Sequence, residues 1–504
     1  MIMIKGRKYM NSLKTFLSSL PHPTSFLEYG VYEASLNTIG QDCVFMVDAI
    51  EKDVIVATGN LSKQFQGNII QEGPFTYAIC DLTHENASVL RSLFPFTKAI
   101  PVLNKKRSFG LGDRLGIAGE GHLNIFKKYD AYPILAQQSI RELTLTHRTY
   151  EDVMDAASFA VYKAGYKDGF GADGDHLKKP EEIEYALGLG FTMITLDASD
   201  YIRNDVSHMD DEAVLKEALL SDYDQSHYLN QTFHVEGIPI HFDELSLKKT
   251  VLIYGKAIDY AVKIYQTYFI NGKADANFEV SIDETATPTE PYQHYYVASE
   301  LSRRGVKLDT MAPRFCGEFQ KGVDYVGDIK QFDDELKVHV AIAKTFGYKL
   351  SIHSGSDKFS IFEIIGKHTE GHFHVKTAGT NWLEAMRVVS QKNPSLYRKI
   401  HAYALSMFNE AKKFYHVSTD IKRIPNLETL KDSELPSLFE HNDARQLIHI
   451  TYGYILNVKN EVGAYMFKDE LFKLWRVERK TYAEYLEKHI GKHLSLLYKG
   501  FKGE

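Results

Sequence analysis

The chain has 504 residues, of which 44% are hydrophobic and 25% are charged. These fractions are typical of a soluble globular protein and exclude a disordered, collagen-like or disulfide-scaffold chain. Lys and Arg number 59 against 66 Asp and Glu, a formal charge of −7 with no basic run. The charge balance therefore argues against a nucleic-acid partner.

The three cysteines lie far apart, at Cys43, Cys80 and Cys316. They predict neither a disulfide framework nor a cysteine-ligated zinc site, which favours a reducing cytoplasm. The basic N-terminal residues 1–23 contain no apolar stretch of signal-peptide length. No segment approaches the roughly 20 apolar residues that span a bilayer. We expect a cytoplasmic protein without a membrane partner.

The first hundred residues contain short strand-like runs at 44–50, 53–59 and 75–82, and one short helical run at 88–94. Apolar runs of this length, separated by polar and glycine-containing turns, are typical of strands. Residues 1–100 are therefore predicted to form a small α/β region ahead of the main domain.

Between 107 and 379, a strand-like run followed by a helical pattern recurs eight times. The predicted strands are 107–116, 132–139, 169–176, 191–199, 278–285, 307–315, 349–356 and 372–379. The segments between them carry helix signals, such as a capping-box-like pair at Thr149 and Asp152 and a terminating Gly305. Eight such units predict a (β/α)₈ barrel, typically about 250 residues, over 101–393; an open doubly wound sheet is the alternative.

Two segments are additional to the eight strand–helix units of a minimal barrel. The connection between the fourth and fifth predicted strands is far longer than one crossover helix, so we expect a helical insertion near 200–250, at the barrel mouth or flank. From 394 to 504, apolar and aromatic residues recur every three to four positions, for example in 441–457 and 471–490. This predicts a helical C-terminal region packed on the barrel, which is also where a homo-oligomer, if formed, would assemble.

In a (β/α)₈ barrel the catalytic side chains follow the carboxyl ends of the strands, and here those positions are polar. The residues are Asp113 and Arg114, Gln137 and Gln138, Asp175 and His176, Asp197 and Asp200, Asp283 and Glu284, Arg314 with Glu318, His353 with Asp357, and His374 with Lys376. Buried parallel strands otherwise consist of Val, Ile and Leu. A metal ion is the most economical shared partner for so many anions and imidazoles.

The best metal-ligand candidates are His176, Glu318 and His353, after the third, sixth and seventh predicted strands. Mixed imidazole and carboxylate ligation suits Zn, Mn, Fe, Co or Ni and does not choose among them. Singly, each side chain could be a hydrogen-bonded histidine or a solvated acid; together on one rim they indicate a metal site. His374 is the reserve ligand, since it alternates onto the same face of the last strand as Lys376.

Asp175 and Glu284 are the candidate acid/base pair, because moving a proton on either face of a substrate needs one group on each face. Asp283 is the alternative to Glu284, and Asp175 could instead orient or extend the ligand His176. The expected substrate-binding residues are Lys376, Arg314 and His374. The segment 169–174 matches G-x-G-x-x-G but follows a helical pattern rather than a strand, so no nicotinamide cofactor is expected.

Several long motifs together resemble the tagaturonate epimerase family, over residues 100 to 457. They are 112–116 (GDRLG), 170–178 (FGADGDHLK), 195–202 (TLDASDYI), 281–285 (SIDET), 303–328 (RRGVKLDTMAPRFCGEFQKGVDYVGD), 349–362 (KLSIHSGSDKFSIF) and 374–385 (HVKTAGTNWLEA). The resemblance implies a barrel and a divalent metal. It also implies inversion at C4 between D-tagaturonate and D-fructuronate in hexuronate catabolism, and in some members between tagatose and fructose.

The resemblance places the general base at Asp175, the partner acid at Glu284 and the metal ligands at His176, Glu318 and His353. The first hundred residues match no motif of the family.

The C4 hydrogen of a 2-keto sugar acid is not acidified by the carbonyl, so two routes are open. One is retro-aldol cleavage of C3–C4 with rotation of the aldehyde; the other is direct proton exchange at C4, which needs far more carbanion stabilisation. The runner-up function is a metal-dependent aldolase or ketose isomerase of sugar acids or sugar phosphates. The alternative outside the enzymes is a barrel that binds a sugar without converting it.

Overall fold

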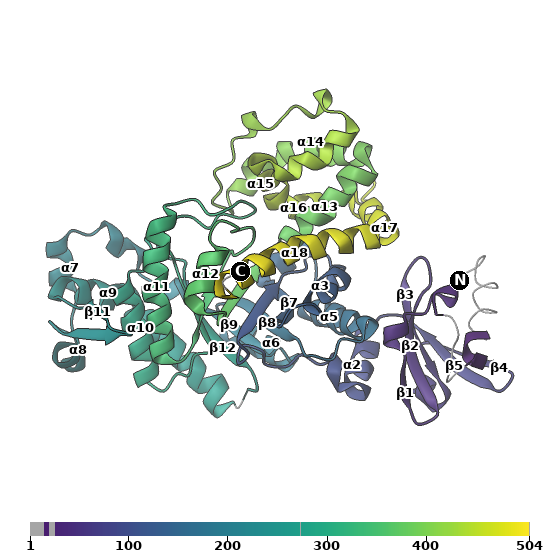
Figure 1. Cartoon of the computed structure of the whole chain (residues 1–504), viewed down its shortest axis with the longest axis horizontal. Helices are drawn as coiled ribbons and strands as arrows, with labels where there is room; N and C mark the ends of the chain where they lie inside the picture. The colour runs from purple at the N-terminus through teal and green to yellow at the C-terminus, as the bar shows by residue number, and fades with distance from the viewer. Residues whose placement is uncertain (1–14, 20–25, 273, 378, 503–504) are drawn as a thin grey trace.

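The computed structural model describes residues 15–19, 26–272, 274–377 and 379–502. Most of the basic N-terminal segment, on which the expectation of an unexported protein was based, lies outside these residues. Figure 1 shows a β-sheet near the N-terminus at one end, a barrel in the middle of the molecule, and a group of helices beside the barrel. Within the described ranges, no helix is long and apolar enough to cross a membrane.

Eight parallel strands close into a barrel, which confirms the predicted (β/α)₈ fold and excludes the open sheet. In order around the barrel they are β6 (Arg107–Leu111), β7 (Tyr132–Ser139), β8 (Gly171–Leu177), β9 (Met193–Asp197), β12 (Asn277–Ile282), β13 (Thr310–Pro313), β14 (Lys349–Ile352) and β15 (Phe373–Thr377). Every strand overlaps one of the eight predicted. The barrel closes where Phe373 of β15 pairs with Arg107 of β6.

Helices follow the strands and form the outer layer. They include α3 (Gly119–Phe126), α4 (Ile140–Thr146), α5 (Tyr150–Ala164), α6 (Pro180–Gly188), α9 (Glu244–Tyr265), α10 (Pro291–Arg303), α11 (Ile329–Phe346) and α12 (Phe362–Thr369). The predicted capping box opens α5, since Thr149 and Asp152 bond reciprocally through side chain and backbone. These caps supply partners for backbone groups that the first turn of a helix leaves free.

The long connection between β9 and β12 lies on the flank of the barrel. It contains α7 (Asp211–Glu217), α8 (Asp222–His227), a hairpin of β10 (Thr232–Val235) and β11 (Ile238–His241), and then α9. The hairpin contacts α10 and α11. Its two strands of four residues are too short to stand out in a mainly helical pattern, and its turn is Glu236–Gly237, both with positive φ.

The N-terminal region is a five-stranded antiparallel sheet with a longer helix and the helical residues 15–19 beside it. The sheet order is β1 (Asn37–Ile39), β2 (Asp42–Asp48), β3 (Asp53–Thr58), β5 (Phe75–Cys80) and β4 (Asn68–Glu72), followed in the chain by α2 (His84–Leu93). The sheet packs on the barrel through α5, where the hydroxyl of Tyr162 donates to the carbonyl oxygen of Val44 at 2.7 Å.

The C-terminal helices share a hydrophobic core built around Trp382 and Trp475, whose rings are 6.0 Å apart. They are α13 (Thr380–Lys392), α14 (Pro394–Lys412), α15 (Asn442–Ile450), α16 (Tyr452–Asn457), α17 (Lys468–Val477) and α18 (Arg479–Lys502). The last helix, α18, runs back across the barrel and packs against both α12 and α3 (Figure 1). It thereby fills the outer position between these two helices.

The contact between α12 and α18 depends on glycine. A Cβ atom on Gly366 would lie 2.0 Å from the carbonyl oxygen of Leu497, and one on Gly500 would lie 2.1 Å from that of Glu363. Replacing Gly366 with Ala should therefore lower the free energy of unfolding by about 1–3 kcal/mol, as measured by guanidinium unfolding.

The matched control is Gly255→Ala in α9, where an added Cβ meets no atom within 4 Å. Alanine there should leave stability unchanged or raise it by up to about 1 kcal/mol, because alanine is the better helix former. Equal losses for the two variants would contradict the proposed role of the α12–α18 contact.

Candidate active site

A single buried ammonium group links three carboxylates inside the barrel. The Nζ atom of Lys376, on β15, lies 2.8 Å from Asp173, 2.8 Å from Asp175 and 3.0 Å from Glu279. It also donates to the hydroxyl of Thr195 at 2.5 Å. All five side chains are buried and come from four different strands. Lys376 therefore acts as the counter-ion of the barrel interior.

This arrangement gives the three acids different pKa values. Burial raises the pKa of Asp173 to about 6, and the neighbouring Asp175 and Glu279 act in the same direction. Burial opposes ionisation of Asp175 as well, but Lys376 and His176 hold its pKa below the ordinary range. The pKa of Glu279 is lowered in the same way by Lys376 and His353. Asp175 is thus an ionised carboxylate at neutral pH.

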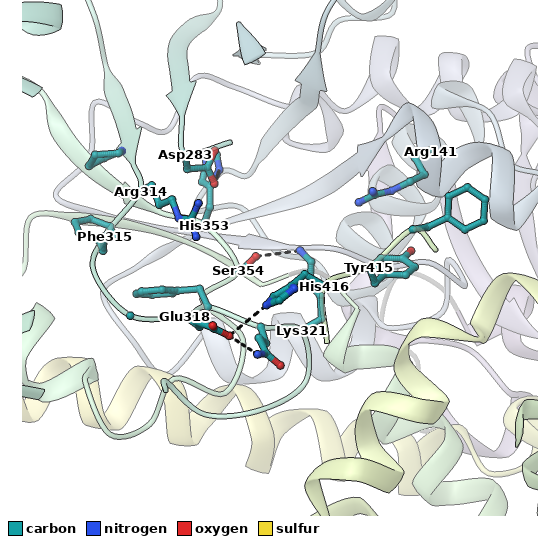
Figure 2. A pocket seen from close by; sticks show the side chains of 15 residues that line it. Arg141, Asp283, Arg314, Phe315, Glu318, Lys321, His353, Ser354, Tyr415 and His416 are labelled. Carbon is teal, nitrogen blue, oxygen red and sulfur yellow. Dashed lines mark hydrogen bonds and ion pairs between the residues drawn. The ribbon is translucent and has the colours of Figure 1, made fainter. Parts of the chain in front are cut away.

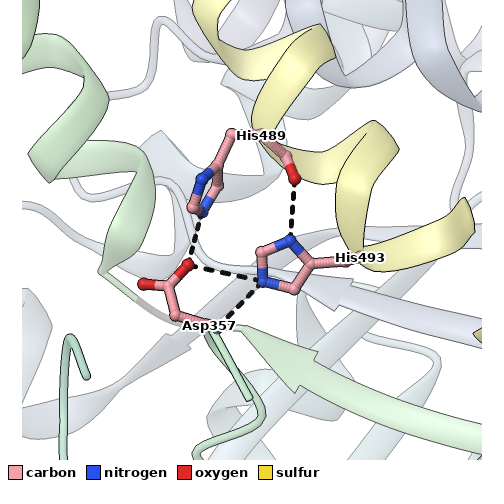
Figure 3. A group of neighbouring side chains, drawn as sticks. All are labelled: Asp357, His489 and His493. Carbon is pink, nitrogen blue, oxygen red and sulfur yellow. Dashed lines mark hydrogen bonds and ion pairs between the residues drawn. The ribbon is translucent and has the colours of Figure 1, made fainter. Parts of the chain in front are cut away.

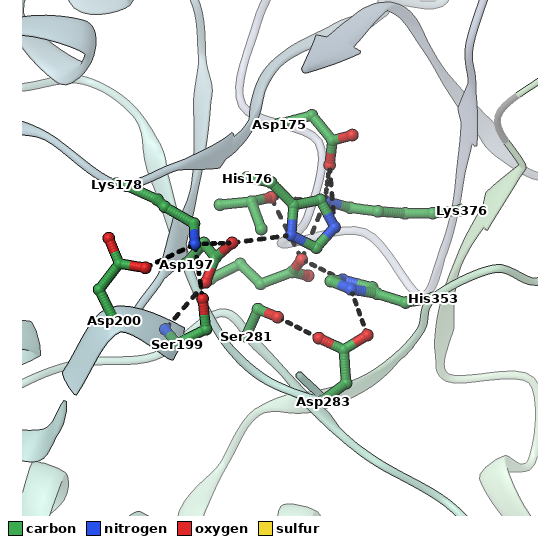
Figure 4. Close-up of polar contacts among 12 residues, drawn as sticks. Asp175, His176, Lys178, Asp197, Ser199, Asp200, Ser281, Asp283, His353 and Lys376 are labelled. Carbon is green, nitrogen blue, oxygen red and sulfur yellow. Dashed lines mark hydrogen bonds and ion pairs between the residues drawn. The ribbon is translucent and has the colours of Figure 1, made fainter. Parts of the chain in front are cut away.

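Two histidine rings lie together beside Asp175 and Lys376, as Figure 4 shows. His176, the residue before the last of β8, has a φ of 54°, and its ring centroid is 4.9 Å from that of His353, which follows β14. Nε2 of His353 is 2.7 Å from Glu279, and Nδ1 is 3.3 Å from Asp283. Burial opposes protonation of His353, but Asp283 and Glu279 raise its pKa to about 10.

The donor set around this pair suits a divalent metal ion. The Nδ1 atoms of His176 and His353 are buried and make no hydrogen bond. Ligand atoms of His176, Asp197 and Glu284 all lie within 4.8 Å of one another. The other nitrogen of His353 faces a carboxylate, as the second nitrogen of metal-ligating histidines usually does. Both Nδ1 atoms face a carboxylate, His353 at 3.3 Å from Asp283 and His176 at 3.8 Å from Asp197, and imidazole nitrogens beside carboxylates fit a metal.

Glu318 lies apart from His176 and His353, although it lines the same cavity as His353. Its carboxylate bonds to the side-chain amide of Gln320 and lies 3.4 Å from Nε2 of His416, and its side chain is 44% exposed. The structure thus brings together His176 and His353, with Asp197 and Glu284 beside them, whereas Glu318 is paired elsewhere. Its role as a ligand stays a prediction.

The three predicted substrate-binding residues lie at different depths. Arg314 lines the cavity and donates to the carbonyl oxygen of Thr285. His374 is fully buried in the barrel, 3.0 Å from the hydroxyl of Ser108, and burial lowers its pKa to about 3. The ammonium of Lys376 is already surrounded by carboxylates. Arg314 is therefore the one of the three that faces the cavity.

The cavity itself opens at the carboxyl ends of β12, β13 and β14 and has a volume of about 290 Å³. It joins strand-end residues to a wall from the C-terminal region, as Figure 2 shows. The lining includes Arg141, Asp283, Arg314, Glu318, Lys321, His353, Ser354, Phe414, Tyr415 and His416. A small molecule in the cavity would contact His353 and Asp283 directly.

A second group of ligand-type side chains joins α18 to the loop after β14. It consists of Asp357, His489 and His493 (Figure 3). Both nitrogens of His493 are engaged, since Nδ1 lies 2.8 Å from the carbonyl oxygen of His489 and Nε2 accepts from the backbone N–H of Asp357 at 3.0 Å. Asp357 is also paired with Arg445 and lies 3.1 Å from His489. The group is therefore a structural ion-pair network rather than a metal site.

The model of the tagaturonate epimerase family matches residues 32–497. The chain belongs to this family. A protein of Thermotoga maritima named tagaturonate/fructuronate epimerase is 42% identical over 475 residues, covering 93% of this chain and 97% of the relative. Family membership makes the chain an epimerase, an enzyme of the isomerase class.

Crystal structures of fructuronate-tagaturonate epimerase UxaE from Cohnella laeviribosi have the same fold. A glycerol complex has a TM-score of 0.93 at 46% identity, covering 98% of this chain and 99% of that chain. The native form has a TM-score of 0.91 at 47% identity, covering 97% and 99%. The family match begins at 32, so it includes the N-terminal sheet, in which no family motif was recognised.

Two members of the site, Asp173 and Glu279, were not among the predicted residues. Both lie on the face of their strands that points into the barrel, two residues before Asp175 and Ser281. The signal was present as alternation: polar residues at 173 and 175, and at 279, 281 and 283, share a face because side chains of a strand alternate. The rule that catalytic residues follow the strand ends does not select residues inside a strand, so it does not predict Asp173 or Glu279.

Proposed function

We propose that the protein interconverts D-tagaturonate and D-fructuronate by inversion at C4 and that it depends on a divalent metal. The family and the named relatives support the substrate pair. The observation that carries the site is the pair of buried Nδ1 atoms of His176 and His353, which make no hydrogen bond and lie beside the ionised carboxylates of Asp175 and Asp283.

His176 and His353 would hold the metal together with one or more carboxylates. Glu318 is the ligand that the family resemblance implies, and Asp197 and Glu284 are the carboxylates nearest His176. A divalent ion there supplies Lewis-acid stabilisation of negative charge on a substrate oxygen. The contact from Glu279 to His353 orients the ring for that role.

Asp175 is the proposed base. In the retro-aldol route it accepts the C4 hydroxyl proton while the C3–C4 bond breaks, and the electron pair of that bond becomes the enolate of the C1–C3 fragment. The C4–C6 fragment, now an aldehyde, rotates, and the enolate attacks its other face. The proton then returns to the new C4 oxygen, from Asp175 or from the acid on the opposite face. Glu284 and Asp283 are the candidates for that second group.

The test is incubation of metal-stripped protein with D-fructuronate in D₂O, with and without Mn²⁺, Zn²⁺, Ni²⁺ or Co²⁺, followed by NMR. We expect D-tagaturonate only when a metal is added, without fragments and without deuterium at C4. Deuterium at C4 would show that the reaction proceeds by direct proton exchange and not by the retro-aldol route. Released fragments would favour the aldolase, and no turnover with any metal would remove the assignment.

Metal binding gives a measurement that does not depend on turnover. His353→Gln should reduce the metal content of the purified protein at least tenfold, in line with the loss caused by disturbing metal-site residues. The matched control is His372→Gln, an exposed histidine just before β15 at the opposite end of the barrel, which should retain wild-type metal content. Equal metal content in all three proteins would contradict the role of His353 as a ligand.

A further inference from the structure

Three cationic side chains that line the cavity, Lys321, Arg141 and Arg314, have no carboxylate within ion-pair distance among the described residues, and Arg314 already donates to the carbonyl oxygen of Thr285. Lys321, on the loop after β13, donates from Nζ to the hydroxyl of Ser354 at 3.1 Å. The guanidinium of Arg141, in the first turn of α4, lies over the ring of Tyr415, 5.1 Å from its centroid. A further cation nearby, Arg114, is neutralised by Glu142 at 2.8 Å. Lys321 and Arg141 therefore carry positive charge that no neighbouring carboxylate in the described part of the chain pairs with.

The surroundings of Lys321 favour an incoming anion. Burial lowers its pKa, and although Glu142 opposes this, Arg141 and Arg114 lower it further. An anion placed between Lys321 and Arg141 would relieve their repulsion and stabilise the charged form of the lysine. Figure 2 shows Lys321 in the middle of the cavity, with Arg141 and Tyr415 on one side and His353 and Asp283 on the other.

The C-terminal region holds the backbone that carries Lys321. From α15, Arg445 donates to the carbonyl oxygen of Gly322 at 2.8 Å, and Gln446 donates to that of Lys321 at 3.1 Å. Tyr415, which lies under Arg141, follows α14 in the same region. Groups fixed in this way lose little freedom when a ligand binds.

We infer that Lys321 and Arg141 bind the carboxylate of the hexuronate and make the enzyme selective for sugar acids over neutral ketohexoses. The inference rests on the proposed function. In a ketohexuronate the carboxylate is C6 and the carbonyl is C2, at nearly opposite ends of the molecule. A carboxylate held by Lys321 and Arg141 directs the carbonyl end toward His353 and Asp283, on the other side of the cavity.

The experiment compares Lys321→Met and Arg141→Met with wild type on D-fructuronate and on D-fructose. D-Fructose serves as substrate or, where its turnover is too slow to follow, as a competing inhibitor. Each variant should raise KM for D-fructuronate about 10- to 100-fold, the range for losing a hydrogen bond to a charged group. KM or Ki for D-fructose should change less than threefold. Lys321→Arg should recover most of the loss.

Arg314→Met is the rival variant, because Arg314 lines the same cavity. Lys330→Met is the distant control, since its side chain is 83% exposed on α11. Equal losses on acid and neutral sugar for Lys321→Met and Arg141→Met, or a selective loss in Arg314→Met alone, would overturn the inference. Titration calorimetry with D-fructuronate keeps the test independent of turnover. Wild type that binds the acid without converting it refutes the proposed function only, and variants that bind it as tightly as wild type refute the inference.

Discussion

Replacing Lys376 with Met is expected to lower the free energy of unfolding by about 3–5 kcal/mol at neutral pH, the usual cost of removing one partner from a buried ion pair. The variant would leave Asp173, Asp175 and Glu279 in the barrel interior without their shared cation. Methionine preserves most of the side-chain length, so the loss reports charge more than packing. The measurement is denaturant unfolding between pH 4 and pH 8.

The pH dependence has a definite sign. In the wild type, Asp175 and Glu279 have lowered pKa values, so their stabilisation exists above the ordinary carboxyl pKa of about 4 and is lost as pH falls through the lowered values. In the variant these acids bind protons more readily. The difference between the two proteins should therefore narrow as pH falls from 8 toward 4.

Two further variants test this explanation. Adding Asp173→Asn to Lys376→Met removes one of the buried carboxylates left without a counter-ion and should recover part of the lost free energy of unfolding. Lys330→Met breaks only an exposed pair with Asp334, so it should leave the free energy of unfolding essentially unchanged. A Lys376→Met protein as stable as the Lys330→Met control would show that Lys376 is not the counter-ion of the cluster.

The second large effect is expected at Asp175. Asp175→Asn should lower kcat for D-fructuronate by about 10²- to 10⁴-fold, because asparagine has the same shape but cannot accept the C4 hydroxyl proton. Asp175 lies 3.9 Å from His176 and is held ionised although it is buried. Steady-state kinetics by NMR, together with metal content and the thermal unfolding midpoint, separate lost proton transfer from lost metal or lost folding.

Asp259→Asn provides the matched control. Asp259 pairs with Arg304 on the outer surface of the barrel, with 67% of its side chain exposed, and its loss should leave kcat within about twofold. Full activity of Asp175→Asn would move the role of base to another carboxylate, with Asp283 the next candidate. Activity lost together with the metal would assign Asp175 to ligand support instead.

The barrel strands could be predicted because each is a buried run bounded by glycine, proline or polar turns. The same local reasoning could not find the β10–β11 hairpin, whose strands are four residues long and whose pairing depends on the turn at Glu236 and Gly237. It also could not place α18. The amphipathic pattern of that helix reveals one apolar face, but it does not say that the face packs between α12 and α3.

The site residues at the carboxyl ends of the strands could be predicted, whereas those deeper in the barrel, Asp173 and Glu279, could not. The strand-end rule led to Asp175, His176 and His353, which the structure brings together. Whether Glu318 faces these residues depends on the loop after β13, in which Gly317 has a φ of 72°. Sequence shows that such a loop follows a strand, but not in which direction its side chains point. Lys321 and Tyr415 come from different regions and meet only through tertiary packing.

The position of α18 also has a consequence for how the chain is made. The last barrel strand ends at Thr377, whereas the helix that covers α3 and α12 ends at Lys502, 125 residues later. At about 5–20 residues per second, the ribosome needs roughly 6–25 s to add them. During synthesis all eight barrel strands are therefore present while this side of the barrel is still uncovered, and the outer layer is completed only after α18 has been synthesised.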